Sequence, residues 1–237
     1  MIDASLHTMA QQMAEGLLDY GPGRSQLLLR VMRKLAHGHP VTGTQVDEFV
    51  TELGLAPDEA QAFLRKVTER NAEGQIVGIM GLSLNESPHR LQVNGVALST
   101  WCAEDTLFLP AMLQQTATIE SPSPISQEMI RLTVSPQRVE AVSPTSAVVT
   151  IVVVDPSEES MASVEAIWMT FCNHILFFAT RSEAEVWAAG RTAIRIAVVS
   201  VDEAFELGQQ LWSRVLPYVE RERQPALDAS LAREPSH

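Results

Sequence analysis

Apolar residues recur at helical spacing along the first seventy positions of the chain. Residues 1–23 predict a helix that ends at the Gly-Pro-Gly sequence of residues 21–23, because both residue types interrupt helices. Three further segments each place their apolar side chains on one helical face. They predict short helices over residues 27–36, 44–53 and 57–67.

Two apolar runs follow, over residues 75–84 and 90–98, with a polar turn that contains proline at residues 85–88 between them. Each run predicts a β-strand. Three short helices followed by a two-stranded ribbon are typical of a winged-helix fold. We therefore predict that residues 1–95 form an N-terminal helix and a winged-helix-like three-helix domain with a β-ribbon.

Helix and strand patterns alternate in the rest of the chain. A short helix is expected at residues 101–109, where Pro110 kinks or ends it. Capping boxes that begin at Ser182 and Ser200 each indicate the start of a helix. The predicted strands lie at residues 130–134, 138–141, 147–154, 173–180 and 194–199, and further helices at 158–169 and 201–219. We predict an α+β chain in which residues 96–220 form a mixed α/β domain with a central sheet.

Composition indicates a folded protein with no membrane span. Of the 237 residues, 46% are apolar and 19% are charged, which is enough apolar material for a packed core. The longest apolar run, residues 147–154, is far shorter than the ~20 residues of a membrane helix. The first 20 residues lack the pattern of a secretion signal, so we expect a cytoplasmic protein. Residues 221–237 are polar and contain two prolines, and they predict a flexible tail.

The charge balance argues against two classes of partner. The chain carries 17 basic and 29 acidic residues, a net charge of −12. The third predicted helix would be the reading helix of a DNA-binding winged helix, yet its acidic and basic residues balance. A nucleic-acid-binding protein usually has a basic face, and a negative protein is repelled by an anionic membrane. We expect neither a nucleic acid nor a membrane as partner.

The chain has two cysteines, Cys102 and Cys172, too few for a disulfide framework. Cys102 and Asp105 are three positions apart, so on a helix the thiol and the carboxyl group would lie side by side. In the first turn of that helix, the helix dipole would lower the pKa of the Cys102 thiol. Cys172 lies at a predicted helix-to-strand junction among aromatic residues, which by itself indicates a core thiol.

Two thiolates that converge with one carboxylate would bind a soft metal ion, and the acid could transfer a proton. Two neighbours are interpreted as uninvolved. Glu104 points about 100° away from Asp105 on a helix, which predicts a solvated side chain. His174 lacks the second ligand cluster of a zinc site, which favours a buried, hydrogen-bonded histidine.

Three ordered motifs carry a resemblance to a known family. They are Trp-Cys-Ala-x-Asp-Thr-Leu-x-x-Pro at residues 101–110, Phe-Cys-x-His-x-x-Phe-Phe-Ala at 171–179, and Val-Val-Ser-Val-x-Glu-Ala-Phe-x-Leu-Gly at 198–208. Over roughly residues 24–215 the chain resembles the organomercurial, or alkylmercury, lyases. The resemblance implies that residues 96–220 form the catalytic lyase domain.

The family cleaves the carbon–mercury bond and yields a hydrocarbon and mercuric ion. The resemblance implies that Cys102, Asp105 and Cys172 are the catalytic residues and hold the substrate or product mercury. Cys102 is the simplest choice of attacking thiolate, although the sequence leaves the order of the two thiols open. The resemblance implies reduced thiols, no organic cofactor, and transfer of mercuric ion to a small thiol or a mercuric reductase. Expected walls of the substrate pocket are Trp101, Phe108, Phe171 and Phe177.

The chain departs from the family pattern at three places. Many members have a second cysteine where this chain has Asn173, and another in the loop that corresponds to residues 120–124. Ser99 stands where a tyrosine is often found. Because the family's chemistry does not need the additional cysteines, we expect these differences to affect stability or secondary metal binding, and the shape of the pocket.

Two alternatives are retained. The same thiols could bind mercury or copper without cleaving any bond, or the chain could be a metal-responsive, DNA-binding regulator. Asp105 favours the enzyme over a simple binding protein, because only the enzyme needs a proton donor.

Overall fold

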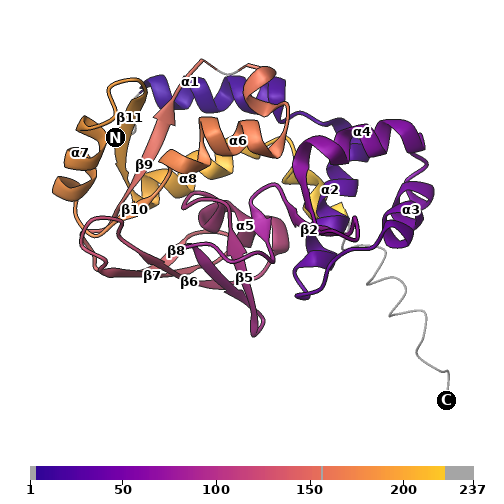
Figure 1. The fold of residues 1–237 in the computed structure, drawn as a ribbon, viewed down its shortest axis with the longest axis horizontal. Coiled ribbons are helices and arrows are strands. Elements are labelled where there is room, and N and C mark those ends of the chain that lie inside the picture. Colours follow the sequence, from indigo (N-terminus) through magenta and orange to yellow (C-terminus); the bar gives the residue numbers. More distant parts are fainter. Residues whose placement is uncertain (1–3, 156, 222–237) are drawn as a thin grey trace.

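A computed structural model describes residues 4–155 and 157–221. The chain has an α+β fold in which one sheet has eight strands, a second has three, and helices pack around them (Figure 1). No helix of the described residues is long and apolar enough to cross a membrane. The predicted tail, from residue 222 onward, lies outside the described residues.

The N-terminal third of the structure is helical, and the order of the three predicted short helices is confirmed. The helices are α1 (Ala4–Gln12) with a π-helical turn at Met13–Leu17, α2 (Gly21–Leu35), α3 (Gly43–Glu52) and α4 (Pro57–Val67). The expectation that Gly-Pro-Gly ends the first helix as a breaker is wrong, because these residues form the first turn of α2. Pro22 fits there because the first turn needs no backbone N–H donor.

The two predicted long strands are wrong in one respect, because each run folds back on itself as a hairpin. The strands are β1 (Thr68–Arg70), β2 (Ile76–Ile79), β3 (Leu82–Ser83), β4 (Arg90–Val93) and β5 (Val96–Thr100). Met80 and Gly81 join β2 to β3 with φ angles of 37° and 93°. Asn94 and Gly95 join β4 to β5 with φ angles of 50° and 80°. Two successive positive φ angles define the tight turn that suits a twisted hairpin.

The larger sheet joins the two predicted domains. Its strand order is β1-β2-β3-β5-β4-β6-β7-β8, with β6 (Ala117–Pro122), β7 (Met129–Val134) and β8 (Val139–Ser143). β4 pairs with β5 on one side and with β6 on the other, both antiparallel. The sheet therefore continues across the predicted boundary at residue 95. The division into two domains and the winged-helix assignment stay predictions.

The segment that contains the second cysteine, Cys172, leads into the smaller sheet. β9 (Val148–Val153) lies between β10 (Phe177–Phe178) and β11 (Arg195–Ser200), antiparallel to both. The predicted strand over residues 173–180 is confirmed only at β10, because Cys172–His174 form a 3₁₀ turn.

Helices that follow β9 pack around these sheets. They are α6 (Val164–Thr170), after a 3₁₀ turn at Glu159–Met161, then α7 (Arg181–Ala189), α8 (Val201–Leu211) and α9 (Pro217–Arg221). The capping box at Ser200 is confirmed, whereas Thr180 rather than Ser182 caps α7. The predicted helix over residues 201–219 is interrupted after α8, because Leu211 is followed by turns before Pro217 begins α9.

The central helix, α5 (Asp105–Leu113), begins at the candidate site residue Asp105 and continues into the hydrophobic core. All nine of its residues are buried, and Pro110 lies inside it. α5 lies between the large sheet and α8 (Figure 1). Gly208 of α8 permits this approach, because a Cβ at that position would lie 3.2 Å from Cβ of Phe108. α5 begins four residues later than predicted, so Cys102 precedes the helix instead of lying in its first turn.

Candidate active site

The segment between β5 and α5 holds Cys102. The backbone N–H of Trp101 donates to the carbonyl of Gly81 at 2.9 Å. The buried Thr100 hydroxyl donates to the carbonyl of Cys102 at 2.8 Å. These two bonds fix the backbone on either side of Trp101, and so fix the direction of the Cys102 side chain.

Cys172 reaches the same place from the other sheet. It begins the 3₁₀ turn after α6, and the Thr150 hydroxyl of β9 donates to the carbonyl of His174 at 2.8 Å. The backbone N–H of Ala103 donates to the carbonyl of Ile175 at 3.1 Å. This last bond ties the Cys102 segment directly to the Cys172 segment, although the two are 70 residues apart in sequence.

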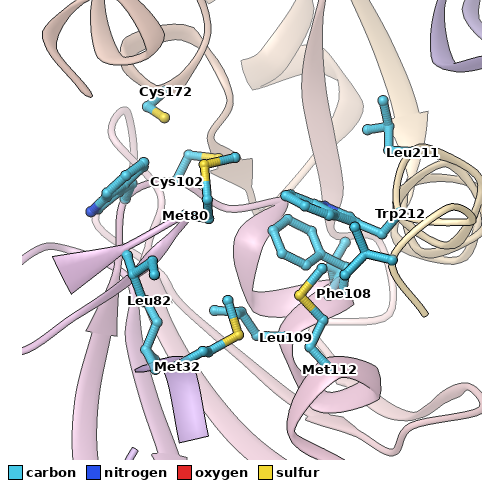
Figure 2. Packing of buried hydrophobic residues seen from close by; sticks show 14 of the residues in the cluster. Met32, Met80, Leu82, Cys102, Phe108, Leu109, Met112, Cys172, Leu211 and Trp212 are labelled. Carbon is cyan, nitrogen blue, oxygen red and sulfur yellow. The ribbon is translucent and has the colours of Figure 1, made fainter. Parts of the chain in front are cut away.

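The structure brings the three predicted site residues together. Ligand atoms of Cys102, Asp105 and Cys172 all lie within 4.8 Å of one another, and their residues are 3%, 7% and 5% exposed. Both cysteines are free thiols. Figure 2 shows them in the buried apolar cluster, with Met80 nearby. In an apolar environment, two thiols can coordinate a soft metal ion and a neighbouring carboxyl group can accept or donate a proton.

The expected activation of Cys102 by a helix dipole is wrong. Burial raises the pKa of the Cys102 thiol well above its usual value, and a hydrogen bond to Cys172 and the charge of Asp105 raise it further. For Cys172 the same hydrogen bond from Cys102 lowers the pKa, while burial and the charge of Asp105 raise it, with a net rise. Both buried thiols therefore hold their protons more strongly than a free cysteine, and the hydrogen bond between them acts in opposite directions on their two pKa values.

Asp105 is the acid of the cluster. Burial raises the pKa of its carboxyl group from 3.8 to about 7, against the lowering effect of hydrogen bonds from Cys102 and Trp101. One of these is the backbone N–H of Cys102, which donates to Oδ2 at 2.7 Å. A pKa near neutrality suits a group that must accept a proton and then give it up.

Glu104 was predicted to be solvated, and this is wrong. Its residue is only 6% exposed, and its Oε1 has no hydrogen-bond partner among the described residues. The carboxyl group lies where α5 meets α8, such that a Cβ at Gly208 would be 3.7 Å from Oε1. Burial, assisted by the charge of Asp105, raises the pKa of Glu104 from 4.5 to about 8. The prediction failed because helical geometry gives the direction of a side chain but not which element will cover it.

The raised pKa of Glu104 makes stability depend on pH. Between pH 4.5 and about 8 the unfolded chain loses this proton while the folded chain keeps it, so the contribution to stability falls as pH rises. Replacing Glu104 with leucine should stabilise the protein by about 2 kcal/mol at pH 9 and much less at pH 5. Thermal unfolding followed by circular dichroism should show a gain of roughly 4–8 °C at pH 9. An equal gain at both pH values would contradict the assignment.

An apolar pocket of about 80 Å³ adjoins the three residues. Its lining includes three of the four predicted walls, Trp101, Phe108 and Phe171. Phe177, the fourth, is not among the lining residues and packs edge-on against His89. The other residues that line it are Met9, Met13, Leu18, Met80, Gly81, Glu104, Ile151, Val152, Met161, Ile167, Ile175, Leu207, Leu211 and Trp212.

Two further sequence interpretations are tested by the surroundings of the site. His174 is half-buried rather than buried, and its Nδ1 has no hydrogen-bond partner within the described part of the chain. A larger hollow of about 1140 Å³ lies over β4–β8 of the large sheet, and Ser99 is among its lining residues. This hollow is lined by neither cysteine, whereas both cysteines line the smaller pocket.

The closeness of the two sulfurs predicts redox sensitivity. Mild oxidation should join Cys102 and Cys172 in a disulfide, with loss of two hydrogens and of activity, and dithiothreitol should restore both thiols. Peptide mass spectrometry without reduction should find the two cysteine peptides linked. Two free thiols after the same treatment would contradict the proximity.

Comparisons with known proteins agree with these features. A family model described as alkylmercury lyase matches residues 82–213. An alkylmercury lyase of Staphylococcus epidermidis is 38% identical over 186 residues, which cover 78% of this chain and 80% of that protein. An alkylmercury lyase of Streptomyces lividans is 34% identical over 219 residues, which cover 89% and 96%. Among solved structures, the mercury-bound form of MerB2 has a TM-score of 0.71 and 25% identity, over 88% of this chain and 99% of that one.

Proposed function

The chain belongs to the alkylmercury lyase family, and we propose that it cleaves the carbon–mercury bond by protonolysis with Cys102, Cys172 and Asp105 as the reacting groups. The observation that carries this proposal is the convergence of two free thiols and one acid within 4.8 Å in an apolar pocket. Members of this family are lyases that act on carbon–mercury bonds. The cluster provides two thiols to bind mercury and a carboxyl group to transfer the proton.

The first step forms a sulfur–mercury bond. The hydrogen bond from Cys102 has a lowering effect on the pKa of the Cys172 thiol, and on this ground we propose Cys172 as the first nucleophile. Its thiolate attacks the mercury of R–Hg–X, and X, a thiolate or halide, leaves with its electron pair, while the proton lost by Cys172 passes to X or to solvent. Cys172–S–Hg–R is the product of this step. This order differs from the simplest order expected from the sequence, in which Cys102 attacks first.

The second and third steps move one proton. Cys102 transfers its S–H proton to the Asp105 carboxylate and becomes the second sulfur ligand of mercury. The added electron density weakens the mercury–carbon bond. Protonated Asp105 then gives the proton to carbon, the Hg–C electron pair forms the new C–H bond, and R–H leaves. Mercuric ion remains on the two sulfurs and Asp105 is again a carboxylate.

The apolar pocket supports both binding and chemistry. Its aromatic and methionine side chains provide a surface for the organic group of the substrate. Exclusion of water strengthens the interaction of the charged thiolates with mercury. We propose that no organic cofactor takes part. An external thiol, either a small molecule or a mercuric reductase, would then remove the mercuric ion by exchange in the cytoplasm.

The first 95 residues have a structural role in this proposal. The charge balance of the chain argues against nucleic acid and membrane partners, and the order of α2, α3, α4, β1 and β2 fits a winged-helix-like unit. Met9 and Met13 of the N-terminal segment line the pocket beside the thiols. The N-terminal part therefore contributes directly to the wall of the site.

The test is product analysis. The protein is incubated with phenylmercury in excess small thiol, and benzene is measured by gas chromatography. We expect one benzene for each phenylmercury consumed, with mercuric ion left on protein or thiol. Intact phenylmercury bound to the protein, with no benzene, would favour the non-enzymatic mercury-binding alternative.

A further inference from the structure

The tight turn between β2 and β3 lies directly against the acid of the site. A Cβ atom at Gly81 would lie 2.5 Å from both Cγ and Oδ1 of Asp105 and 2.9 Å from its Cβ. These separations are shorter than any real contact between such atoms. No side chain fits at position 81 while Asp105 keeps its present conformation.

The turn cannot easily move away from Asp105. The carbonyl of Gly81 accepts a hydrogen bond from the backbone N–H of Trp101 at 2.9 Å. The backbone N–H of Met80 donates to the carbonyl of Val67, at the end of α4, at 3.1 Å. The turn is thus anchored on one side to the segment that carries Cys102 and on the other side to the N-terminal helices.

The Asp105 carboxyl group is confined from two directions. The Cys102 N–H donates to Oδ2 at 2.7 Å, and Cγ and Oδ1 occupy the space that a Cβ at Gly81 would take. The carboxyl must rotate if that space is filled, and rotation breaks the bond from Cys102. The present conformation, in which the acid lies near both sulfurs, therefore depends on the missing side chain at position 81.

The residue before Gly81 indicates that the turn is not optimised for hairpin formation alone. Met80 has a φ of 37° and is 5% exposed, whereas the equivalent residue of the β4–β5 turn is Asn94. Asparagine tolerates a positive φ, and a long side chain such as methionine rarely adopts it. Strained residues of this kind gather at functional sites, and Met80 indeed lines the pocket.

We propose that Gly81 is a positioning residue for the lyase reaction: because it has no side chain, the Asp105 carboxyl group can take the orientation that delivers the proton to carbon. The proposal rests on the proposed function, in which Asp105 is the acid. On this proposal the β2–β3 turn is also part of the active site, because it determines the orientation of Asp105.

The chain offers a matched control for the test. Gly81→Ala and Gly95→Ala both place alanine at the second position of a two-residue turn, with φ of 93° and 80°. Backbone strain is therefore similar, yet nothing lies within 4 Å of a Cβ at Gly95. We expect Gly81→Ala to lower kcat for phenylmercury cleavage by about 10²-fold, the scale of a 1 Å misplacement of a catalytic group. Gly95→Ala should keep the kcat of the wild type, and its change in Tm measures the backbone strain that the two variants share.

Three further measurements separate positioning from general damage. Gly81→Ala should still bind one mercuric ion with both thiols. Its crystal structure should show the Asp105 carboxyl rotated away and its bond to the Cys102 N–H lost, a result that does not depend on activity. Adding Asp105→Asn to Gly81→Ala should lower kcat no further than Asp105→Asn alone, because both changes remove the same contribution.

Other outcomes would overturn the inference. They are an unmoved Asp105 in the crystal structure, an equal kcat for Gly81→Ala and Gly95→Ala, or additive losses in the double variant. If Gly81→Ala does not fold, Asp105→Glu tests the same placement from the other side, since one additional methylene moves the carboxyl group away from its present place beside Gly81. Near wild-type cleavage by Asp105→Glu would reject the proposal. Failure of the wild type to release benzene would instead reject the proposed function.

Discussion

Replacement of Asp105 with asparagine is expected to slow the release of benzene from phenylmercury by about 10²–10⁴-fold, the usual contribution of a positioned general acid. Asparagine has the same shape, and its side-chain oxygen can still accept the hydrogen bond that the Cys102 N–H now gives to Oδ2. It cannot take the proton from Cys102 or give it to carbon. The measurement is kcat in excess small thiol, with benzene measured by gas chromatography.

The control for this variant is mercury binding. Both thiols remain in Asp105→Asn, so the protein should still bind one mercuric ion with an affinity close to that of the wild type. Loss of cleavage with retention of binding identifies Asp105 as the proton donor. Wild-type rates in the asparagine variant would show that the proton comes from elsewhere, and Glu104 would be the next group to test because it is also a buried carboxyl that lines the pocket.

Replacement of Cys172 with serine is expected to reduce cleavage even more, on the order of 10⁴-fold or greater, as happens when a reacting member of a catalytic unit is removed. A hydroxyl group is a poor ligand for a soft ion, so mercury would be held by one sulfur alone. Retention of mercuric ion against a competing dithiol should fall together with kcat. Cys102→Ser should behave in the same way, because the mechanism needs both sulfurs on mercury.

These two replacements differ in a way that tests the order of the thiols. If Cys172 makes the first bond to mercury, as proposed above, Cys102→Ser should still take up R–Hg⁺ rapidly without cleaving it. Cys172→Ser should take it up slowly. Stopped-flow measurement of thiol consumption distinguishes the two variants, and faster uptake by Cys172→Ser would restore the order in which Cys102 attacks first.

The pattern of apolar residues predicted where most elements lie but not where two strands reverse. The run over residues 90–98 contains Asn94-Gly95, a pair typical of a tight hairpin turn, and this local signal could have divided it into β4 and β5. The run over residues 75–84 contains Met80-Gly81 instead. Methionine gives no such signal, because its conformation there is imposed by tertiary contacts to α4 and to the site.

The three residues of the candidate site could be predicted because ordered motifs carry them, but their electrostatics could not. The pKa of Cys102 depends on complete burial and on Cys172, which is 70 positions away. The burial of Glu104 depends on α8, whose Gly208 leaves room beside Oε1. Both effects arise from elements that are distant in sequence, so neither spacing nor composition contains them.

The continuity of the large sheet limits how this enzyme can be divided. A fragment that began at residue 96 would lose β1–β4, which would leave β5 without either neighbouring strand and expose the edge of β6 that pairs with β4. The same cut would remove Met80 and Gly81 from beside the thiols. A C-terminal fragment alone should therefore lack lyase activity. Gene fusions or circular permutations should keep residues 68–143, which form the large sheet, as one uninterrupted segment.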